Sequence, residues 1–170
     1  MAGLEFFRLA TRLARRLAPG QTVRWSLQTN GLLLDDEWCR FLAEERFLVG
    51  WSLDGPARLH DAYRRDRQGR GSHKVVVGAL RPMQQHGVEV NVLVAVHAEN
   101  TAYPLEVYHH LRGLGARHLQ FIPVVEREAS GPEQALGLRL GAPESAGRRR
   151  TPWSVPPEAY GEFLVRVFDE

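Results

Sequence analysis

Two short apolar segments that each end at polar residues and a glycine turn constrain most strongly what this chain can fold into. The first, residues 22–31, reads Thr-Val-Arg-Trp-Ser-Leu-Gln-Thr-Asn-Gly, and the second, residues 47–56, reads Phe-Leu-Val-Gly-Trp-Ser-Leu-Asp-Gly-Pro. An amphipathic segment follows each of them. Buried parallel strands have this pattern, and the carboxyl ends of such strands carry the functional site in α/β folds.

The rest of the chain continues this alternation of strand-like and helix-like segments. Strands are predicted at residues 22–27, 47–53, 88–96 and 118–124. Helices are predicted at residues 3–18, from 35 onward, from 72 to just before 87, at 104–114 and from 159 to 168. Residues 61–71 are expected to form a polar loop, and residues 126–157, rich in Gly, Pro, Arg and Glu, a long surface loop.

Regular alternation of this kind implies parallel strands joined by right-handed crossovers. Two architectures fit the pattern: an open doubly wound sheet, or part of a β/α barrel. Periodicity does not separate them. In either case Asn30, Ser52, His97 and Pro123 are expected to lie along one rim.

The composition favours a soluble protein of ordinary globular type. No apolar run approaches the roughly 20 residues of a membrane span and no signal peptide opens the chain, so a cytoplasmic location is expected. The net charge is only +2, and no aromatic residues interleave with the arginines, so a solvated surface is favoured over a nucleic-acid interface. Cys39 is the single cysteine, and the seven histidines show no metal-ligand spacing, so no metal site is expected.

The residues at the predicted strand ends resemble those of a known family. Ser26–Gly31 (Ser-Leu-Gln-Thr-Asn-Gly), residues 52–56 (Ser-Leu-Asp-Gly-Pro), residues 60–66 and residues 119–123 (Leu-Gln-Phe-Ile-Pro) are similar to the anaerobic sulfatase-maturating enzymes. These are radical S-adenosylmethionine (SAM) enzymes. The resemblance covers residues 3 to about 126 and continues from about 156. It implies a partial parallel barrel of six β/α units, of which this chain would supply four strands.

The resemblance also implies segments that this sequence does not contain. In the family, a Cys-x-x-x-Cys-x-x-Cys triad holds a [4Fe-4S] cluster, a Gly-Gly-Glu-Pro motif meets the amino group of SAM, and a cysteine-rich C-terminal domain holds auxiliary clusters. Residues 1–170 would therefore be an incomplete radical SAM domain, an interior fragment of a longer enzyme, and inactive in isolation. Cys39 cannot replace the triad, because such clusters need several thiolates.

The activity implied by the resemblance is the oxidation of a cysteine or serine of a sulfatase to formylglycine through a 5′-deoxyadenosyl radical. The implied partners are a sulfatase polypeptide, as substrate, and a reductant protein for the cluster. Three alternatives stay open: a non-catalytic truncated remnant, a related radical SAM maturase acting on another peptide, and a small doubly wound binding protein.

Ser52 and Arg64 are the first candidates for a binding site. Ser52 ends the second predicted strand and Arg64 lies in the loop after it. A hydroxyl and a guanidinium there can hold a carboxylate by charge-assisted hydrogen bonds. The resemblance implies that both bind the carboxylate of SAM; otherwise Ser52 closes a turn and Arg64 is a solvated arginine.

Four further positions are candidates. Gln28 and Asn30 end the first strand, where their amides could orient a substrate peptide or simply make a turn, since Asn-Gly is a turn signal. The resemblance implies that Gln120 and Val125 pack around the adenosine of SAM, Val125 through its backbone. Asp54 is interpreted as a turn residue, and no catalytic residue is assigned within this chain.

Overall fold

The computed structural model describes residues 3–141 and 149–170, which alternate helices and parallel strands along the chain. The strands are β1 (Trp25–Thr29), β2 (Phe47–Ser52), β3 (Glu89–Val96) and β4 (His118–Pro123). The helices are α1 (Leu4–Leu17), α2 (Asp36–Glu44), α3 (Ala57–Tyr63), α4 (His73–Gly78), α5 (Leu80–Gln85), α6 (Pro104–Gly113), α7 (Gly131–Ala135) and α8 (Pro157–Phe168).

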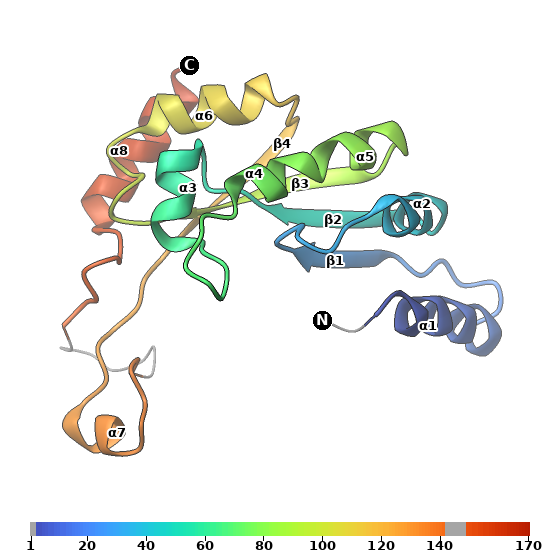
Figure 1. The fold of residues 1–170 in the computed structure, drawn as a ribbon, viewed down its shortest axis with the longest axis horizontal. Coiled ribbons are helices and arrows are strands. Elements are labelled where there is room, and N and C mark those ends of the chain that lie inside the picture. Colours follow the sequence, from blue (N-terminus) through green and yellow to red (C-terminus); the bar gives the residue numbers. More distant parts are fainter. Residues whose placement is uncertain (1–2, 142–148) are drawn as a thin grey trace.

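The four strands form one open, fully parallel sheet in the order β1-β2-β3-β4 (Figure 1). The register pairs Gln28 with Gly50, Ser52 with Leu93, and Leu93 with Gln120. Because all strands run the same way, their carboxyl ends share one edge. The expected parallel arrangement is therefore confirmed.

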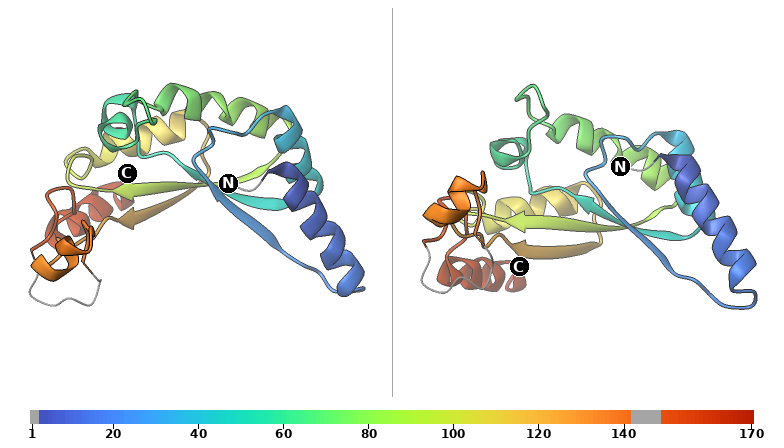
Figure 2. Two further views of the ribbon diagram at one scale, coloured as in Figure 1. Left: turned by 60° about the horizontal axis from the view of Figure 1, so that its bottom comes forward. Right: turned by 90° about the horizontal axis from the view of Figure 1, so that it is seen from below.

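One face of the sheet is covered by helices and the other is open. Figure 2 shows α3 to α6 together on one side of the sheet. Side chains on that side, such as Val49, Trp51 and Val94, are fully buried. The opposite face carries Ser26, Gln28 and Leu48, which are exposed. A doubly wound sheet would need helices on both faces, so over the described residues the structure has the one-sided layering of a partial barrel.

The terminal helices pack on the same face as the others. Phe7 of α1 meets Trp38 and Phe47 edge-on, with ring centroids 5.4 and 6.3 Å apart. In α8, Phe163 packs against Phe121 of β4 at 5.2 Å. Burying side chains of this size stabilises a fold by about 1.5–3 kcal/mol each. The core therefore lies between the sheet and a single layer of helices.

The element boundaries correct several expectations. The first strand begins at Trp25 rather than at residue 22, and residues 57–63 are helical, so that the polar loop expected from residue 61 begins only after residue 63. The helix predicted from residue 72 divides into α4 and α5 at Ala79, because Pro82 has no N–H to continue the helical ladder. Within the predicted loop 126–157, α7 forms a short helix; residues 142–148 of that loop lie outside the described residues.

Candidate functional site at the carboxyl edge of the sheet

The loop after β2 turns back on itself and places a buried carboxylate at the sheet edge. Asp54 follows the last strand residues and precedes Gly55, whose φ of 121° allows the turn. The Asp54 side chain is 2% exposed, and its Oδ1 accepts the Ala95 N–H of β3 at 2.8 Å. The carboxylate thus stands where a further residue of β2 would offer its backbone carbonyl to β3.

Arg64 neutralises this buried carboxylate. Its Nε donates to Asp54 Oδ2 and its Nη2 donates to Oδ1 at 3.1 Å, so one edge of the guanidinium is paired with the carboxylate. The Arg64 side chain remains 31% exposed. A guanidinium has five N–H donors, so those not used by Asp54 are left for another acceptor. The pairing explains why a charged side chain can be buried at this position.

A chain of hydrogen bonds fixes the backbone that carries Arg64. The Asp54 N–H donates to His60 Nδ1 at 3.2 Å, and His60 Nε2 lies 3.0 Å from Ser72 Oγ. Ser72 Oγ donates its proton to the Arg64 carbonyl at 3.0 Å, so it must accept from His60 Nε2. His60 is therefore the neutral Nε2–H tautomer. Burial lowers the pKa of His60 to about 4, which keeps the imidazole neutral.

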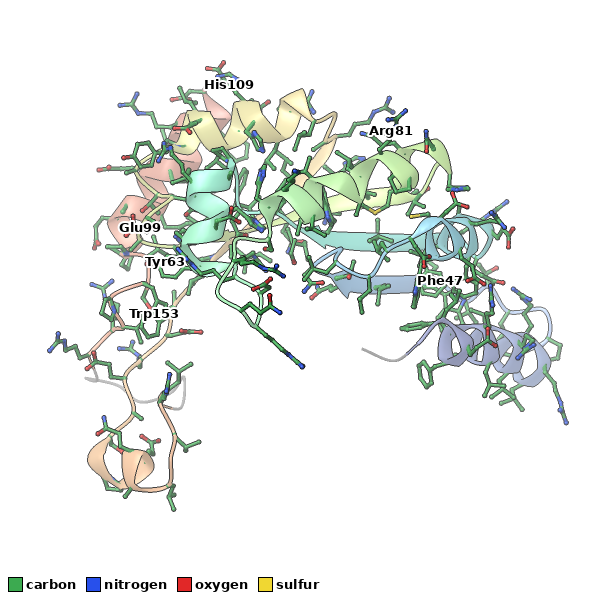
Figure 3. The ribbon with its side chains drawn as sticks, viewed as in Figure 1. Phe47, Tyr63, Arg81, Glu99, His109 and Trp153 are labelled. Atoms are coloured by element: carbon green, nitrogen blue, oxygen red, sulfur yellow. The ribbon has the colours of Figure 1, made fainter. Side chains whose placement is uncertain are left out.

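A cavity of about 400 Å³ opens beside Asp54 and Arg64. Figure 3 shows Tyr63, Glu99 and Trp153 at one end of the sheet, with Phe47 at the other. The indole Nε1 of Trp153 donates to the carboxylate of Glu126, and both residues line the cavity. The lining residues come from the turn after β2, the end of α3, the end of β3 and the segments that follow β3 and β4, and they are Asp54, Tyr63, Arg64, Ala95, His97, Val124, Glu126 and Trp153.

Three of the predicted site residues lie on the open face of the sheet. A Cβ added to Gly50 would approach the side chains of Leu93 and Gln28, so that face carries Gly50, Gln28 and, two residues along the strand, Ser52. Gln120 stands in the same row as Ser52, with Leu93 between them, and its Oε1 accepts from Asn91 Nδ2 at 3.3 Å. Gln28, Ser52 and Gln120 therefore share a surface.

The remaining predicted residues lie apart from this surface. Asn30 makes a turn, because its Oδ1 accepts the Leu32 N–H at 3.3 Å. Val125 is exposed and lines a separate cavity of about 650 Å³ with Arg149, Arg150 and Tyr160. Arg64 faces its own cavity, and Ser52 is not among the residues lining it. Apart from Asn30, which makes a turn, the predicted residues are thus divided among three surfaces: the open face, the Arg64 cavity and the Val125 cavity.

Sequence reasoning missed several groups that build the site. Asp54, interpreted as a turn residue, is also the charge partner of Arg64. Asn100 Nδ2 joins the two loops by donating to the Asp54 carbonyl at 3.2 Å and to the Ala95 carbonyl at 2.9 Å. The only available signal was the position of Asp54 and His97 just after apolar strands, since Arg64 and Asn100 lie 10 and 46 residues from Asp54 in the sequence.

The described residues offer no set of ligands for an iron–sulfur cluster. Cys39 is fully buried in α2, and burial raises the pKa of its thiol to about 11, so it is poorly suited to bind metal as a thiolate. Residues 3–141 and 149–170 contain no group of three or more His, Cys, Asp or Glu side chains able to hold a metal ion.

Within residues 3–141 and 149–170, no helix has the length and apolar character needed to cross a membrane.

Comparison with known proteins gives consistent matches to one group. No protein-family model matches the chain. The serine-type anaerobic sulfatase-maturating enzyme of Bacteroides thetaiotaomicron is 38% identical over 100% of this chain and 41% of its own length. The cysteine-type enzyme of Clostridium perfringens (strain 13 / Type A) is 31% identical over 99% of this chain and 42% of its own.

A solved structure agrees with the sequence matches. Native anSMEcpe with bound AdoMet (SAM) and the Cp18Cys peptide superposes with a TM-score of 0.80, at 31% identity, over 99% of this chain and 42% of that chain. The chain therefore spans about two-fifths of the length of the proteins it matches, and the fold agrees over that part.

Proposed function

Because this chain is a homologue of the anaerobic sulfatase-maturating enzymes over about 40% of their length, we propose that it contributes the cofactor- and peptide-binding edge of a radical SAM sulfatase maturase. The observation that carries the proposal is the paired Arg64, held by Asp54 with unused N–H donors beside a cavity at the carboxyl edge of a parallel sheet. Related structures contain AdoMet and substrate peptides.

In this proposal Arg64 binds the carboxylate of SAM through the guanidinium N–H groups that Asp54 leaves free. Charge-assisted hydrogen bonds of this kind contribute about 1.5–3 kcal/mol. Ser52 and Gln120 share the open face, where they would contact the rest of the cofactor, and Val125 would act through its backbone. When bound to a reduced cluster, SAM supplies the hydrogen-abstracting radical; the cysteines for that cluster are not among these residues.

Gln28 is the residue of the open face best placed to contact a substrate peptide. It is exposed on the edge strand β1 and packs over the buried Gly50 with which it is in register. The proposed substrate is a sulfatase peptide whose cysteine or serine is oxidised to formylglycine. The serine-type relative is the more similar of the two, which makes a serine peptide the first substrate to test.

A chimaera tests the proposal. The matching segment of the Bacteroides thetaiotaomicron enzyme is replaced by this chain, and formylglycine is measured by mass spectrometry on otherwise identical serine and cysteine peptides. We expect product from at least one peptide and loss of product with Arg64→Lys. That variant keeps a positive charge beside Asp54 but removes the two-pronged guanidinium.

Arg65→Lys is the matched control, since Arg65 is exposed and its Nη1 donates to a backbone carbonyl, that of Gly69, at 3.2 Å. A well-folded chimaera without product from either peptide would contradict the proposal and favour a non-catalytic remnant. Equal loss with Arg65→Lys and Arg64→Lys would show that the loop acts only through its general positive charge.

A further inference from the structure

His97 is a buried histidine whose proton position is fixed by its neighbours. It directly follows β3 at the carboxyl edge and is 3% exposed. Its Nδ1 accepts the N–H of Glu99 at 3.2 Å and that of Asn100 at 3.4 Å. A nitrogen that accepts carries no proton, so the neutral ring holds its proton on Nε2. Burial lowers the pKa of His97 and thereby favours this neutral form.

The Nε2–H group of His97 has no hydrogen-bond partner among the described residues. The Tyr63 ring packs against the imidazole nearly at right angles, with centroids 4.5 Å apart, but a ring face is only a weak acceptor. Leaving a buried donor unsatisfied costs about 1–3 kcal/mol. A fixed donor kept unpaired at a functional edge is therefore a candidate contact for a ligand.

The cavity that His97 lines also contains the unused donors of Arg64. The side chains of Arg64, Asp54 and Glu126 bring one positive and two negative formal charges to its walls. That excess of negative charge disfavours a free inorganic anion. A carboxylate carried on a zwitterion or a cation fits better, because its own positive charge offsets the second carboxylate of the cavity. An α-amino-acid group has this combination.

We infer that His97 is a further ligand-binding residue, whose Nε2–H donates to the carboxylate of an α-amino-acid group that Arg64 also contacts. This inference rests on the proposed function to the extent that the α-amino-acid group belongs to SAM. It adds a second donor, from the loop after β3, to the one from the loop after β2. The ligand would then bridge two loops that Asn100 already joins.

Nitrogen-15 NMR of the histidine side chains in the 170-residue chain tests the inference. SAM and L-methionine are titrated separately, with L-methionine amide as the probe that lacks a carboxylate and acetate as the lone anion. We expect a saturable shift of the His97 Nε2 resonance with SAM and with L-methionine. The amide should give none, and acetate should be the weaker ligand.

A variant gives a second readout. In His97→Asn, the side-chain oxygen can still accept from Glu99 and Asn100, but the Nε2 donor is gone; SAM should bind about tenfold more weakly. His118→Asn is the matched control, because His118 is exposed at the start of β4, on the opposite edge, and should leave the affinity unchanged.

The outcomes separate the two ideas. If SAM binds but neither the His97 resonance nor the His97→Asn affinity changes, the inference is wrong and the proposed function stands. If SAM does not bind but L-methionine shifts the resonance, the His97 assignment stands and the proposed cofactor does not. If neither SAM nor L-methionine binds, both are overturned. The wild-type titration decides the matter even if His97→Asn does not fold.

Discussion

At the scale of single residues, the site depends on a buried aspartate whose carboxylate and backbone N–H are hydrogen-bonded by three partners in all. Asp54 accepts from Arg64 and from the Ala95 N–H, while its own N–H is taken by His60. Each of these partners belongs to a different segment. Removing one of them therefore leaves a polar group unpaired in the protein interior, which costs more than the hydrogen bond itself contributes.

The Arg64→Ala variant should destabilise the fold by about 2 kcal/mol, because it leaves the Asp54 carboxylate buried without its cation; the partial exposure of Arg64 keeps the loss below that of a fully buried pair. Urea denaturation measures this loss of unfolding free energy.

Adding Asp54→Asn to Arg64→Ala should recover much of the loss, since an amide oxygen can still accept from the Ala95 N–H. The exposed Arg58–Glu106 pair is the control, and Arg58→Ala should cost less than about 1 kcal/mol. Equal losses for the two arginines would contradict this account.

Stability should depend on pH through His60. Its pKa lies near 4 in the folded protein, against about 6.5 when exposed, so between these values the unfolded chain binds more protons. The contribution of neutral His60 to the free energy of unfolding is therefore complete above pH 6.5. It is lost as the pH falls toward 4, by up to about 1.4 kcal/mol per pH unit. Buried His97 and half-buried His73 and His110, whose pKa values are also lowered by desolvation, act in the same direction.

Denaturation at pH 5 and pH 7 tests this dependence. The His60→Asn variant should lose part of the pH dependence, whereas His118→Asn, at an exposed position, should keep all of it. If the unfolding free energy of His60→Asn changes between pH 5 and pH 7 as much as that of the wild type, the other histidines cause the pH dependence.

At the scale of elements, the strand-to-helix turns do most to shape the site. After β1, Gly31 adopts a φ of 76° and passes close to the buried indole of Trp51: a Cβ added there would lie 2.8 Å from Trp51 Nε1. After β2, the chain turns at Gly55 into α3, which carries His60. The turns thus combine an unusual backbone conformation with close packing against the layer of helices.

A pair of glycine substitutions separates these two effects. Gly20 has a φ of 80° with nothing within 4 Å of an added Cβ, so Gly20→Ala should cost only the backbone strain, about 1 kcal/mol. Gly31→Ala adds the collision with Trp51 and should cost at least about 1 kcal/mol more. Equal unfolding free energies for the two variants would mean that the indole moves aside freely.

Much at this scale could be predicted from sequence. The parallel direction of the strands followed from apolar runs that alternate with helical spacing. The helix expected from residue 35 is α2, and the Asp35 side chain caps it by accepting from the Trp38 N–H at 2.9 Å. Helix α3 was missed because Leu59 and His60 are its only buried residues, too few for a periodic pattern. The Asp54–Arg64 pair was missed because it depends on how a turn folds back.

At the scale of the whole molecule, an open parallel sheet has helices on one side and a polar face on the other. The resemblance to a family singled out Ser52 and Gln120 as candidate binding residues, and the register of the strands puts them in one row on that face. Their separation from the Arg64 cavity could not be predicted, because it depends on the course of the loops after β2 and β4. Within the described residues, the sheet ends at β1 and at β4, which pair on one side only.

The 170-residue chain should not assemble a [4Fe-4S] cluster. It has a single cysteine, buried in the core, and such clusters need several thiolates. Anaerobic reconstitution followed by iron and sulfide analysis measures this, with Cys39→Ala as the control for adventitious iron. Stoichiometric cluster on the wild type that is absent from Cys39→Ala would contradict the ligand assignment.

The pairing of Arg64 with Asp54 also bears on the entropy of binding. An arginine side chain has many rotamers, and immobilising one when a ligand arrives costs about 0.5–1.5 kcal/mol. Asp54 is itself anchored to β3 through the Ala95 N–H, so Arg64 is ordered before any ligand is present. The cost is met during folding, and the affinity for a ligand need not include it. The turn after β2 thereby holds the long, flexible side chain of Arg64 in a fixed position relative to the sheet.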